Sequence, residues 1–290
     1  MAVREFTIAV AAGKGGTGKT LLSTSLALAL AQAHPNRVQL VDCDAEEPNA
    51  HLLLPVQVRH ERTVKVRVAR VLEARCTACG RCAAACQFGA LALMRRRVAV
   101  FPALCIGCGT CAFVCPESAM LEEERVVGSL LLGRVCGALE FTQGRIHVGE
   151  QRVTPVLQAL RKALAPGMIR VLDAPPGTAC PMQETISGAD ACLLVTEPTP
   201  FGCSDLTAAV ETCRALGVPC SVVINRTGVG ERSVYDYCAR EGIPVLLEIP
   251  WRRAIAEAYA RGGTLLDADP AWADSLRTLF RQTAVVAERR

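Results

Sequence analysis

The chain has 290 residues, which at about 150 residues per domain gives an expectation of two domains and a sizeable core. Hydrophobic residues make up 51% of the chain and aromatic residues only 4%, which excludes intrinsic disorder and favours an α/β fold with buried parallel strands. The net charge of +4 is small and comes with no basic helix and no stripe of interleaved basic and aromatic residues, so no nucleic-acid partner is expected.

Strand and helix patterns alternate through both ends of the chain. Residues 7–12 form an apolar, β-branched run, and a glycine-rich loop separates them from residues 21–33, which have helical length. The same alternation predicts further strands at 38–41, 169–172, 191–196, 221–224 and 245–249, and further helices at 155–165, 205–216, 232–241, 251–261 and 271–287. We therefore expect a parallel sheet that is covered by helices on both faces.

The alternation stops between residues 59 and 125, where cysteines and glycines replace the periodic apolar residues. This stretch holds 11 Lys and Arg against 6 Asp and Glu, and half of the 16 cysteines of the chain. We predict an inserted domain at 59–125 within a discontinuous domain of residues 1–58 and 126–290. In the absence of a signal peptide, the cysteines are expected to bind metal or to react as thiols rather than to form disulfides.

Two charge-free runs are long enough to test as membrane spans, residues 20–36 and 98–116. The first carries several polar residues and the second carries proline, glycines and cysteines, so neither predicts a transmembrane helix. The N-terminus has early charges and no cleavable apolar region. The expectation is a cytoplasmic protein with no membrane partner.

A phosphate-binding loop pattern, G-x-x-x-x-G-K-[ST], occurs between the first predicted strand and helix. The glycines allow backbone N–H groups to converge on phosphate oxygens at the N-terminus of the helix. Lys19 is expected to neutralise the β- and γ-phosphates of ATP, and the hydroxyl of Thr20 to bind Mg²⁺. The loop consists of Gly13, Lys14, Gly15, Gly16, Thr17, Gly18, Lys19 and Thr20.

Because of its extra lysine at position 14, the loop resembles that of the deviant Walker A ATPases, the group of MinD, Mrp and ParA that includes the nitrogenase iron protein. The resemblance implies a P-loop NTPase fold that hydrolyses ATP. It also implies a nucleotide-dependent homodimer, in which Lys14 reaches the phosphates bound by the partner subunit.

Five further ATPase positions follow from the same resemblance. Asp44 corresponds to the residue of the first switch that orients or deprotonates the attacking water, although an acidic residue at a strand end is otherwise often a solvated cap. In the second switch, Asp173 corresponds to the residue that holds the water shell of Mg²⁺, and Gly177 lets the backbone approach the γ-phosphate. Asn225 corresponds to the position that contacts the adenine, and Pro250 belongs to the loop that closes over the base. The alternative for such residues is an ordinary turn without a ligand contact.

Two four-cysteine runs repeat the spacing C-x₂-C-x₂-C-x₃-C. This spacing is typical of bacterial two-cluster ferredoxins, in which the fourth cysteine of each run ligates the other cluster. It predicts two [4Fe-4S] clusters rather than zinc sites or disulfides. We assign to the first set Cys76, Cys79, Cys82 and Cys115, and to the second set Cys105, Cys108, Cys111 and Cys86.

A ferredoxin domain inserted after the first switch makes the whole chain resemble the MinD-superfamily P-loop ATPases that contain an inserted ferredoxin domain. The resemblance leaves two functions open. In one, ATP turnover is coupled to electron transfer through both clusters to a redox partner. In the other, a carrier similar to Mrp delivers a cluster to an apo iron–sulfur or metallocofactor client under ATP control. A positioning ATPase like MinD is disfavoured, because the C-terminal helix is more simply a core-packing helix than a membrane anchor.

Cys180 follows Asp173 by seven residues, the offset at which the nitrogenase iron protein carries a ligand of its subunit-bridging cluster. One interpretation is a third cluster on the two-fold axis of the homodimer, with Cys136 as a further candidate ligand. The other interpretation is an inert thiol. The remaining cysteines are expected to be core or surface thiols.

Overall fold

The computed structural model describes residues 5–288 and divides the chain into two compact units. The first, which we call the sheet unit, consists of Met1–Arg62, Leu130–Arg145 and Val156–Arg290. The second, which we call the cysteine unit, consists of Thr63–Ser129 and Ile146–Pro155. The cysteine unit is therefore made of two chain segments, and the second of them comes from the region that sequence reasoning grouped with the flanking domain.

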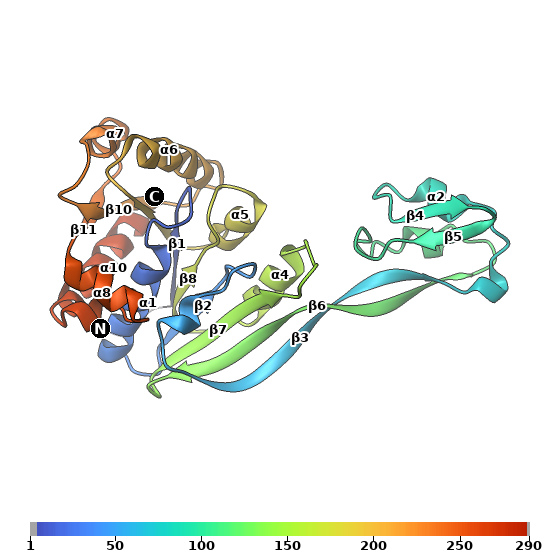
Figure 1. Cartoon of the computed structure of the whole chain (residues 1–290), viewed down its shortest axis with the longest axis horizontal. Coiled ribbons are helices and arrows are strands. Elements are labelled where there is room, and N and C mark those ends of the chain that lie inside the picture. Colours follow the sequence, from blue (N-terminus) through green and yellow to red (C-terminus); the bar gives the residue numbers. More distant parts are fainter. Residues whose placement is uncertain (1–4, 289–290) are drawn as a thin grey trace. The chain divides into compact units, whose positions relative to one another are not determined.

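The sheet unit is built on a sheet with the strand order β11-β10-β9-β1-β8-β2-β7-β6-β3, of which β3 and β6 continue into the cysteine unit (Figure 1). All six pairings between β11 and β7 are parallel, so the expected parallel sheet is confirmed. The strands of the sheet are β1 (Phe6–Ala11), β2 (Val38–Asp42), β3 (Val56–Val71), β6 (Met120–Val135), β7 (Leu139–Ile146), β8 (Ile169–Asp173), β9 (Ala191–Thr196), β10 (Cys220–Thr227) and β11 (Val245–Pro250).

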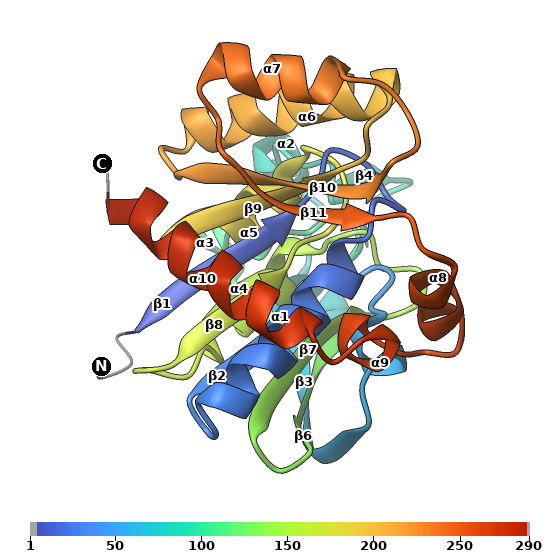
Figure 2. The same cartoon turned by 90° about the vertical axis from the view of Figure 1, so that its left-hand side faces the viewer.

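Helices cover this sheet on both sides, as the alternation of the sequence predicts. One group packs around α1, which contacts α9 and α10, whereas α6 packs on β9 and against α7; Figure 2 shows these groups on opposite faces. No helix described between residues 5 and 288 is long and apolar enough to cross a membrane. The helices are α1 (Lys19–Ala33), α4 (Thr154–Lys162), α5 (Cys180–Ile186), α6 (Pro200–Ala215), α7 (Ser233–Glu241), α8 (Arg253–Ala260), α9 (Leu265–Ala268) and α10 (Trp272–Glu288).

Three strands, β3, β6 and β7, are absent from the sequence prediction. In β3 the buried Val64 and Val68 are separated by the charged Lys65 and Arg67, so the strand is half polar and lacks the apolar run of the buried strands. β7 pairs in parallel with β2 and thereby extends the sheet beyond the expected edge. Alternation with a period of two was the available signal for β3.

The cysteine unit has little regular structure of its own. It contains the antiparallel pair β4 (Leu91–Met94) and β5 (Arg97–Val100), together with the short helices α2 (Arg81–Ala85) and α3 (Thr110–Phe113). Cysteines form part of its small core, which consists of Val68, Ala69, Cys82, Ala90, Leu91, Cys105 and Met120. Two cysteines thus take part in the packing of this unit.

Candidate functional site

The glycine-rich loop of residues 13–20 connects β1 to α1. Gly18 caps α1 in the left-handed conformation with a φ of 98°, and Lys19 begins the helix with 7% of its surface exposed. The free N–H groups of the first helical turn therefore face the loop and favour an anion there. Burial lowers the pKa of the Lys19 ammonium, while the nearby carboxylates of Asp173 and Asp44 oppose that shift.

Close packing behind the loop fixes its path. A Cβ atom at Gly18 would lie 2.3 Å from Nδ2 of Asn225, so only glycine fits there. The same Nδ2 donates a hydrogen bond to the carbonyl oxygen of Thr17 at 2.8 Å, and Oδ1 of Asn225 accepts one from the N–H of Arg226 at 2.9 Å. Asn225 thus braces the loop, a role that sequence reasoning did not assign to it, and its contact with adenine stays a prediction.

The loop predicted to be the first switch is organised by Asp42, the last residue of β2. Its buried carboxylate accepts hydrogen bonds from the backbone N–H groups of Asp44 at 3.1 Å and of Asn49 and Ala50 at 3.0 Å. These bonds shape the loop that carries the half-buried Asp44 to the cavity described below. Burial raises the pKa of Asp44. Burial, followed by the charge of Asp173, raises the pKa of Asp42 well above its usual value.

Asp173 ends β8, directly beside Asp42 in the register of the parallel pair. Both of its carboxylate oxygens are buried, and neither forms a well-aligned hydrogen bond. Burial raises the pKa of Asp173 to about 6, while the hydroxyl of Thr20 and the ammonium of Lys19 oppose the rise. A buried carboxylate next to a lysine and the hydroxyl of Thr20 fits a hydrated Mg²⁺ held through its water shell.

A cavity of about 510 Å³ opens over the loop. It brings together eight of the residues singled out from the sequence: Gly15, Gly16, Gly18, Lys19, Thr20, Asp44, Asn225 and Pro250. Gly13, Lys14, Thr17, Asp173 and Gly177 do not line it, although all of them belong to the loop or the second switch. Trp251, Ile255 and Tyr259 form a wall next to Pro250, and the last two were not recognised because their helix carries no motif.

Lys14 has a different environment from Lys19. Its ammonium lies 3.8 Å from the carboxylate of Asp205 in α6, and both side chains are about one third exposed, at 35% and 34%. The start of the loop is pressed against the same place, because a Cβ atom at Gly13 would lie 2.2 Å from the carbonyl oxygen of Asp205. Lys14 is thus held at the surface by a weak ion pair, free to exchange partners.

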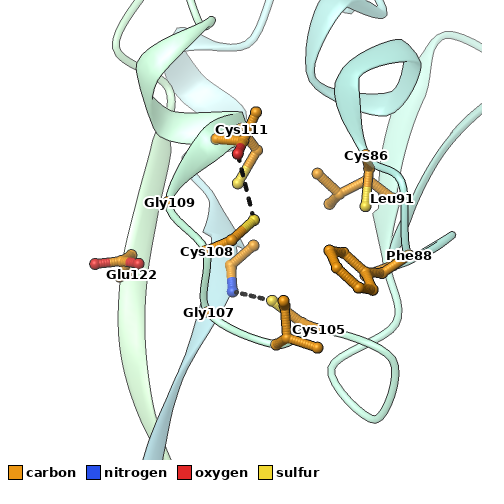
Figure 3. Close-up of a pocket in the computed structure, with 13 residues that line it drawn as sticks. Cys86, Phe88, Leu91, Cys105, Gly107, Cys108, Gly109, Cys111 and Glu122 are labelled. Atoms are coloured by element: carbon orange, nitrogen blue, oxygen red, sulfur yellow. Dashed lines mark hydrogen bonds between the residues drawn. The ribbon is translucent and has the colours of Figure 1, made fainter.

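The cysteine unit contains two further cavities, each walled by four cysteines. Cys76, Cys79, Cys82 and Cys115 line one of them, and Cys86, Cys105, Cys108 and Cys111 line the other. Figure 3 shows Cys86 across the second cavity from the three other cysteines. Within residues 5–288, no group of three or more His, Cys, Asp or Glu side chains is arranged to hold a single metal ion.

Matching backbone conformations accompany the two cysteine runs. Ala78 and Gly80 in the first run have φ angles of 54° and 76°, and Gly107 and Gly109 at the equivalent positions of the second run both have 73°. A Cβ atom at Gly107 would lie 2.5 Å from the carbonyl oxygen of Arg67, so this turn requires glycine. The repeat in the sequence is therefore also a repeat in the structure.

Backbone N–H groups donate to one sulfur of each set. The N–H of Ala69 donates to Sγ of Cys105 at 3.3 Å, and the N–H of Ala119 donates to Sγ of Cys115 at 3.2 Å. Such bonds stabilise negative charge on a ligand sulfur. Each cysteine set therefore has one sulfur that accepts a backbone hydrogen bond.

Cys180 and Cys136 lie at opposite ends of the sheet. Cys180 is exposed and begins α5, after the carboxyl end of β8. Cys136 is exposed in the turn before β7, and because β7 pairs in parallel with β2, that turn lies at the amino end of the strands. The structure therefore does not bring Cys136 to Cys180 within one chain.

Comparison with known proteins gives one match to a family model and several relatives. The model for the CobQ/CobB/MinD/ParA nucleotide binding domain matches residues 8–265. Two uncharacterized proteins of Methanocaldococcus jannaschii are each 27% identical to this chain: MJ0578 over 277 residues (95% of both chains) and MJ0579 over 263 residues (89% of this chain and 91% of the relative). The solved septum site-determining protein MinD of Pyrococcus horikoshii OT3, complexed with Mg-ADP, is similar with a TM-score of 0.60 and 18% identity over 96% of this chain and 95% of that chain.

Proposed function

The chain belongs to the CobQ/CobB/MinD/ParA nucleotide-binding family, and on this premise we propose that it couples ATP hydrolysis in a homodimer to electron transfer through two [4Fe-4S] clusters. One observation carries the proposal. The same chain that forms the phosphate loop and both switches also forms two cavities walled by four cysteines each, in the crossed combination of two-cluster ferredoxins.

ATP hydrolysis is assigned to the loop and the two switches. The N–H groups of the loop cradle the phosphates, and Lys19 neutralises the β- and γ-phosphates. Thr20 and Asp173 hold Mg²⁺, directly and through its water shell, and the freedom of Gly177 at a φ of 91° lets the backbone approach the γ-phosphate. Asp44 orients the attacking water and accepts its proton, a task that its raised pKa suits.

The cysteine sets fit the clusters by donor chemistry and by arrangement. Four thiolates around one cavity are the ligand set of a [4Fe-4S] cluster, which supplies one-electron transfer when it is bound. The N–H groups of Ala69 and Ala119 stabilise the ligand sulfurs. The left-handed turns at Gly80 and Gly109 begin α2 and α3 and so bring the third cysteine of each run to its cavity.

The homodimer is supported by the position of Lys14. Its exposed ion pair with Asp205 is weak enough to open, so the ammonium can reach a phosphate bound by a second copy of the chain. We expect Lys14→Ala to remain monomeric with MgATP and to lose turnover, whereas wild type dimerises. Size-exclusion chromatography with light scattering measures the difference. Normal turnover by a monomeric variant would remove this part of the proposal.

The decisive experiment is anaerobic purification, an iron count and a potentiometric titration followed by electron paramagnetic resonance, with and without MgATP. We expect about eight irons per chain and a reduction potential that shifts when MgATP is added. A shift of 59 mV corresponds to about 1.4 kcal/mol for one electron. No iron at all, after purification without oxygen, would refute the electron-transfer part and leave the ATPase part standing.

A second function, delivery of a cluster to an apo iron–sulfur or metallocofactor client, is favoured by Cys180. This exposed thiol at the start of α5 lies in the second switch, where a subunit-bridging third cluster has a ligand available from each copy. It predicts about ten irons per chain, no shift with MgATP, and selective loss of the excess iron to a chelator. Cys180→Ser should then reduce the count to about eight.

A further inference from the structure

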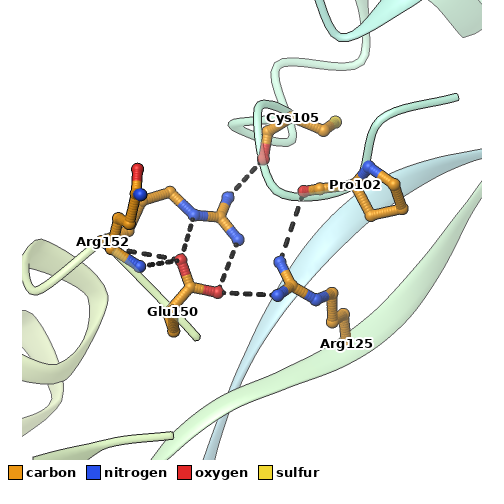
Figure 4. Close-up of polar contacts among 6 residues, drawn as sticks. Pro102, Cys105, Arg125, Glu150 and Arg152 are labelled. Carbon is orange, nitrogen blue, oxygen red and sulfur yellow. Dashed lines mark hydrogen bonds and ion pairs between the residues drawn. The ribbon is translucent and has the colours of Figure 1, made fainter. Parts of the chain in front are cut away.

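A buried carboxylate binds two arginines in the cysteine unit. The side chain of Glu150 is only 3% exposed and lies 3.0 Å from Nη2 of Arg125 and 3.0 Å from Nε of Arg152. The backbone N–H groups of Gln151 and Arg152 also donate to its Oε1, at 3.1 and 3.0 Å. Figure 4 shows Glu150 between the two guanidinium groups. A carboxylate with this many charge-assisted partners holds both arginines in fixed positions.

Both arginines donate their remaining hydrogen bonds to one short turn. Nη1 of Arg152 donates to the carbonyl oxygen of Cys105, and Nη1 of Arg125 donates to that of Pro102 at 3.4 Å. This turn leads into the second cysteine run and ends at its first cysteine. The network thus attaches the entrance of the second cysteine set to residues 146–155, which come from a separate segment of the chain.

We call the network of Glu150, Arg125 and Arg152 the clamp. The first cysteine run has the same turn but no such network. In the turn 72–76, the N–H groups of Arg75 and Cys76 donate three residues back, at 3.0 and 3.2 Å. In the turn 101–105, those of Leu104 and Cys105 do the same, at 3.0 and 3.3 Å. Among the residues that the structure describes, no side chain donates to a carbonyl group of the first turn. The two halves of the repeat therefore differ at one equivalent place.

We propose that the network of Glu150, Arg125 and Arg152 distinguishes the second cysteine set from the first, by fixing its entrance turn and raising the reduction potential of the cluster bound there. The proposal rests on the proposed function, because it requires that both cysteine sets carry clusters. Reduction adds one negative charge, and the guanidinium groups stabilise that charge. A single electron supplied by a one-electron reductant then comes to rest on the second set, with no proton moved.

Other charges beside the two cavities leave this difference in place. Glu122 lines the second cavity, but its carboxylate is paired with Arg67 at 3.3 Å. The first cavity is lined by one arginine, Arg81, and one glutamate, Glu117. Arg125, Glu150 and Arg152 do not line the second cavity themselves, but the hydrogen bond from Arg152 to the carbonyl group of Cys105 places their surplus positive charge beside a cysteine of the second set.

Arg152→Gln in the full chain, purified without oxygen, tests the proposal. We expect this variant to lower the midpoint potential of the cluster in the second set by about 59 mV, which for one electron is a tenfold change in the reduction equilibrium. The midpoint potential of the cluster in the first set should stay unchanged. Arg152→Lys should retain part of the effect. Arg70→Gln is the matched control, because this substitution removes the same charge. Arg70 pairs with Glu123 on the strands and lines neither cavity.

Cys79→Ser, which removes a ligand of the first set only, identifies the couple that belongs to the second set. Arg125→Gln provides an independent variant should Arg152→Gln lose iron, and selective loss of the second signal in either variant also supports the clamp. Unchanged midpoints in both arginine variants, or equal shifts in Arg152→Gln and Arg70→Gln, would overturn the inference. A wild-type chain without iron would instead refute the proposed function.

Discussion

The two units of the chain are built around very different cores. The sheet unit has an extensive apolar core of strands and helices, with Ile8, Leu26, Leu40 and Phe141 at most 1% exposed. The cysteine unit has only a small cluster of apolar residues, and its cysteines are members of that cluster. On the proposed function, we therefore expect the sheet unit to fold without a nucleotide and the cysteine unit to depend on ligands of its thiols.

The chemistry of the two units differs in the same way. In the sheet unit, the fold places charged side chains in a buried site. The strands around Asp173 hold its carboxylate there without a well-aligned hydrogen bond. In the cysteine unit, the functional side chains are themselves part of the packing. If the proposed function holds, the functional groups cost stability in the first unit and supply stability in the second.

Removal of iron is the strongest test of this difference. We expect anaerobic chelation to abolish the amide protection of residues 63–129, because ligand binding and packing are one process there, while the core of the sheet unit keeps its protection. Hydrogen exchange with mass spectrometry measures both units in one sample. ATP binding should survive chelation. Loss of nucleotide binding together with iron would mean that the units do not fold independently.

Lys19→Ala tests the comparison from the other side. The buried ammonium of Lys19 belongs to the nucleotide site, so we expect ATP turnover to fall by about 10²- to 10³-fold, a typical loss for one preorganised electrostatic group. The iron content should not change, because no cysteine lies near it in the chain. Lys65→Ala is the control, since Lys65 is exposed and pairs only with Glu124 at 2.7 Å. Wild-type turnover in Lys19→Ala would contradict the assignment of the loop.

Asp173→Asn examines the cost of the buried carboxylate. Because burial raises the pKa of Asp173 to about 6, ionisation destabilises the folded state, and stability is lost as the pH rises through that value. At pH 8 and without nucleotide, the free energy of unfolding of the neutral variant should therefore be about 1–3 kcal/mol higher than that of wild type. The gain should vanish near pH 4. Urea unfolding across this pH range measures it.

Asp42→Asn is the contrasting variant for that experiment. Asp42 is buried like Asp173, but its carboxylate accepts three backbone N–H bonds, and an amide must lose some of them. Because burial raises the pKa of Asp42 as well, while the lost hydrogen bonds oppose the gain, we expect this variant to gain less stability at pH 8 than Asp173→Asn gains. An equal gain in the two variants would show that the three hydrogen bonds do not distinguish Asp42 from Asp173.

The smallest expected effect is that of Cys79→Ser on the iron content of the protein. It removes one ligand of the first set, so about four of the eight irons should be lost, a twofold decrease. ATP turnover in the absence of a redox partner should be retained, in keeping with independent units. Cys136→Ser, at an exposed turn of the sheet unit, is the control for the loss of a surface thiol. Unchanged iron in Cys79→Ser would remove that residue from the ligand set.

The sequence was sufficient where local spacing determines the structure. The phosphate loop and the two cysteine runs are short patterns, and neighbouring residues decide their conformation, as the matching φ angles of Gly80 and Gly109 illustrate. The parallel sheet followed from the alternation of buried apolar runs with helices. Whether the predicted residues bind ATP, Mg²⁺ and clusters stays with the experiments above.

Features that depend on distant pairing could not be predicted. The contact of Glu150 with Arg125 joins two positions that are separated in sequence by the rest of β6 and by β7, and no pattern near Glu150 predicts its partner. Asn225 reads as a turn residue, although its amide braces a loop at the other end of the chain. In both cases tertiary packing, not local propensity, determines what the side chain does.

The discontinuous cysteine unit also has a consequence for the order of synthesis. All eight cysteines of the two runs are translated before Glu150 and Arg152. Until residues 146–155 have been translated, the turn at residues 101–105 lacks the hydrogen bond from Arg152. The last segment of the cysteine unit to be made is thus the one that completes its network of Glu150, Arg125 and Arg152.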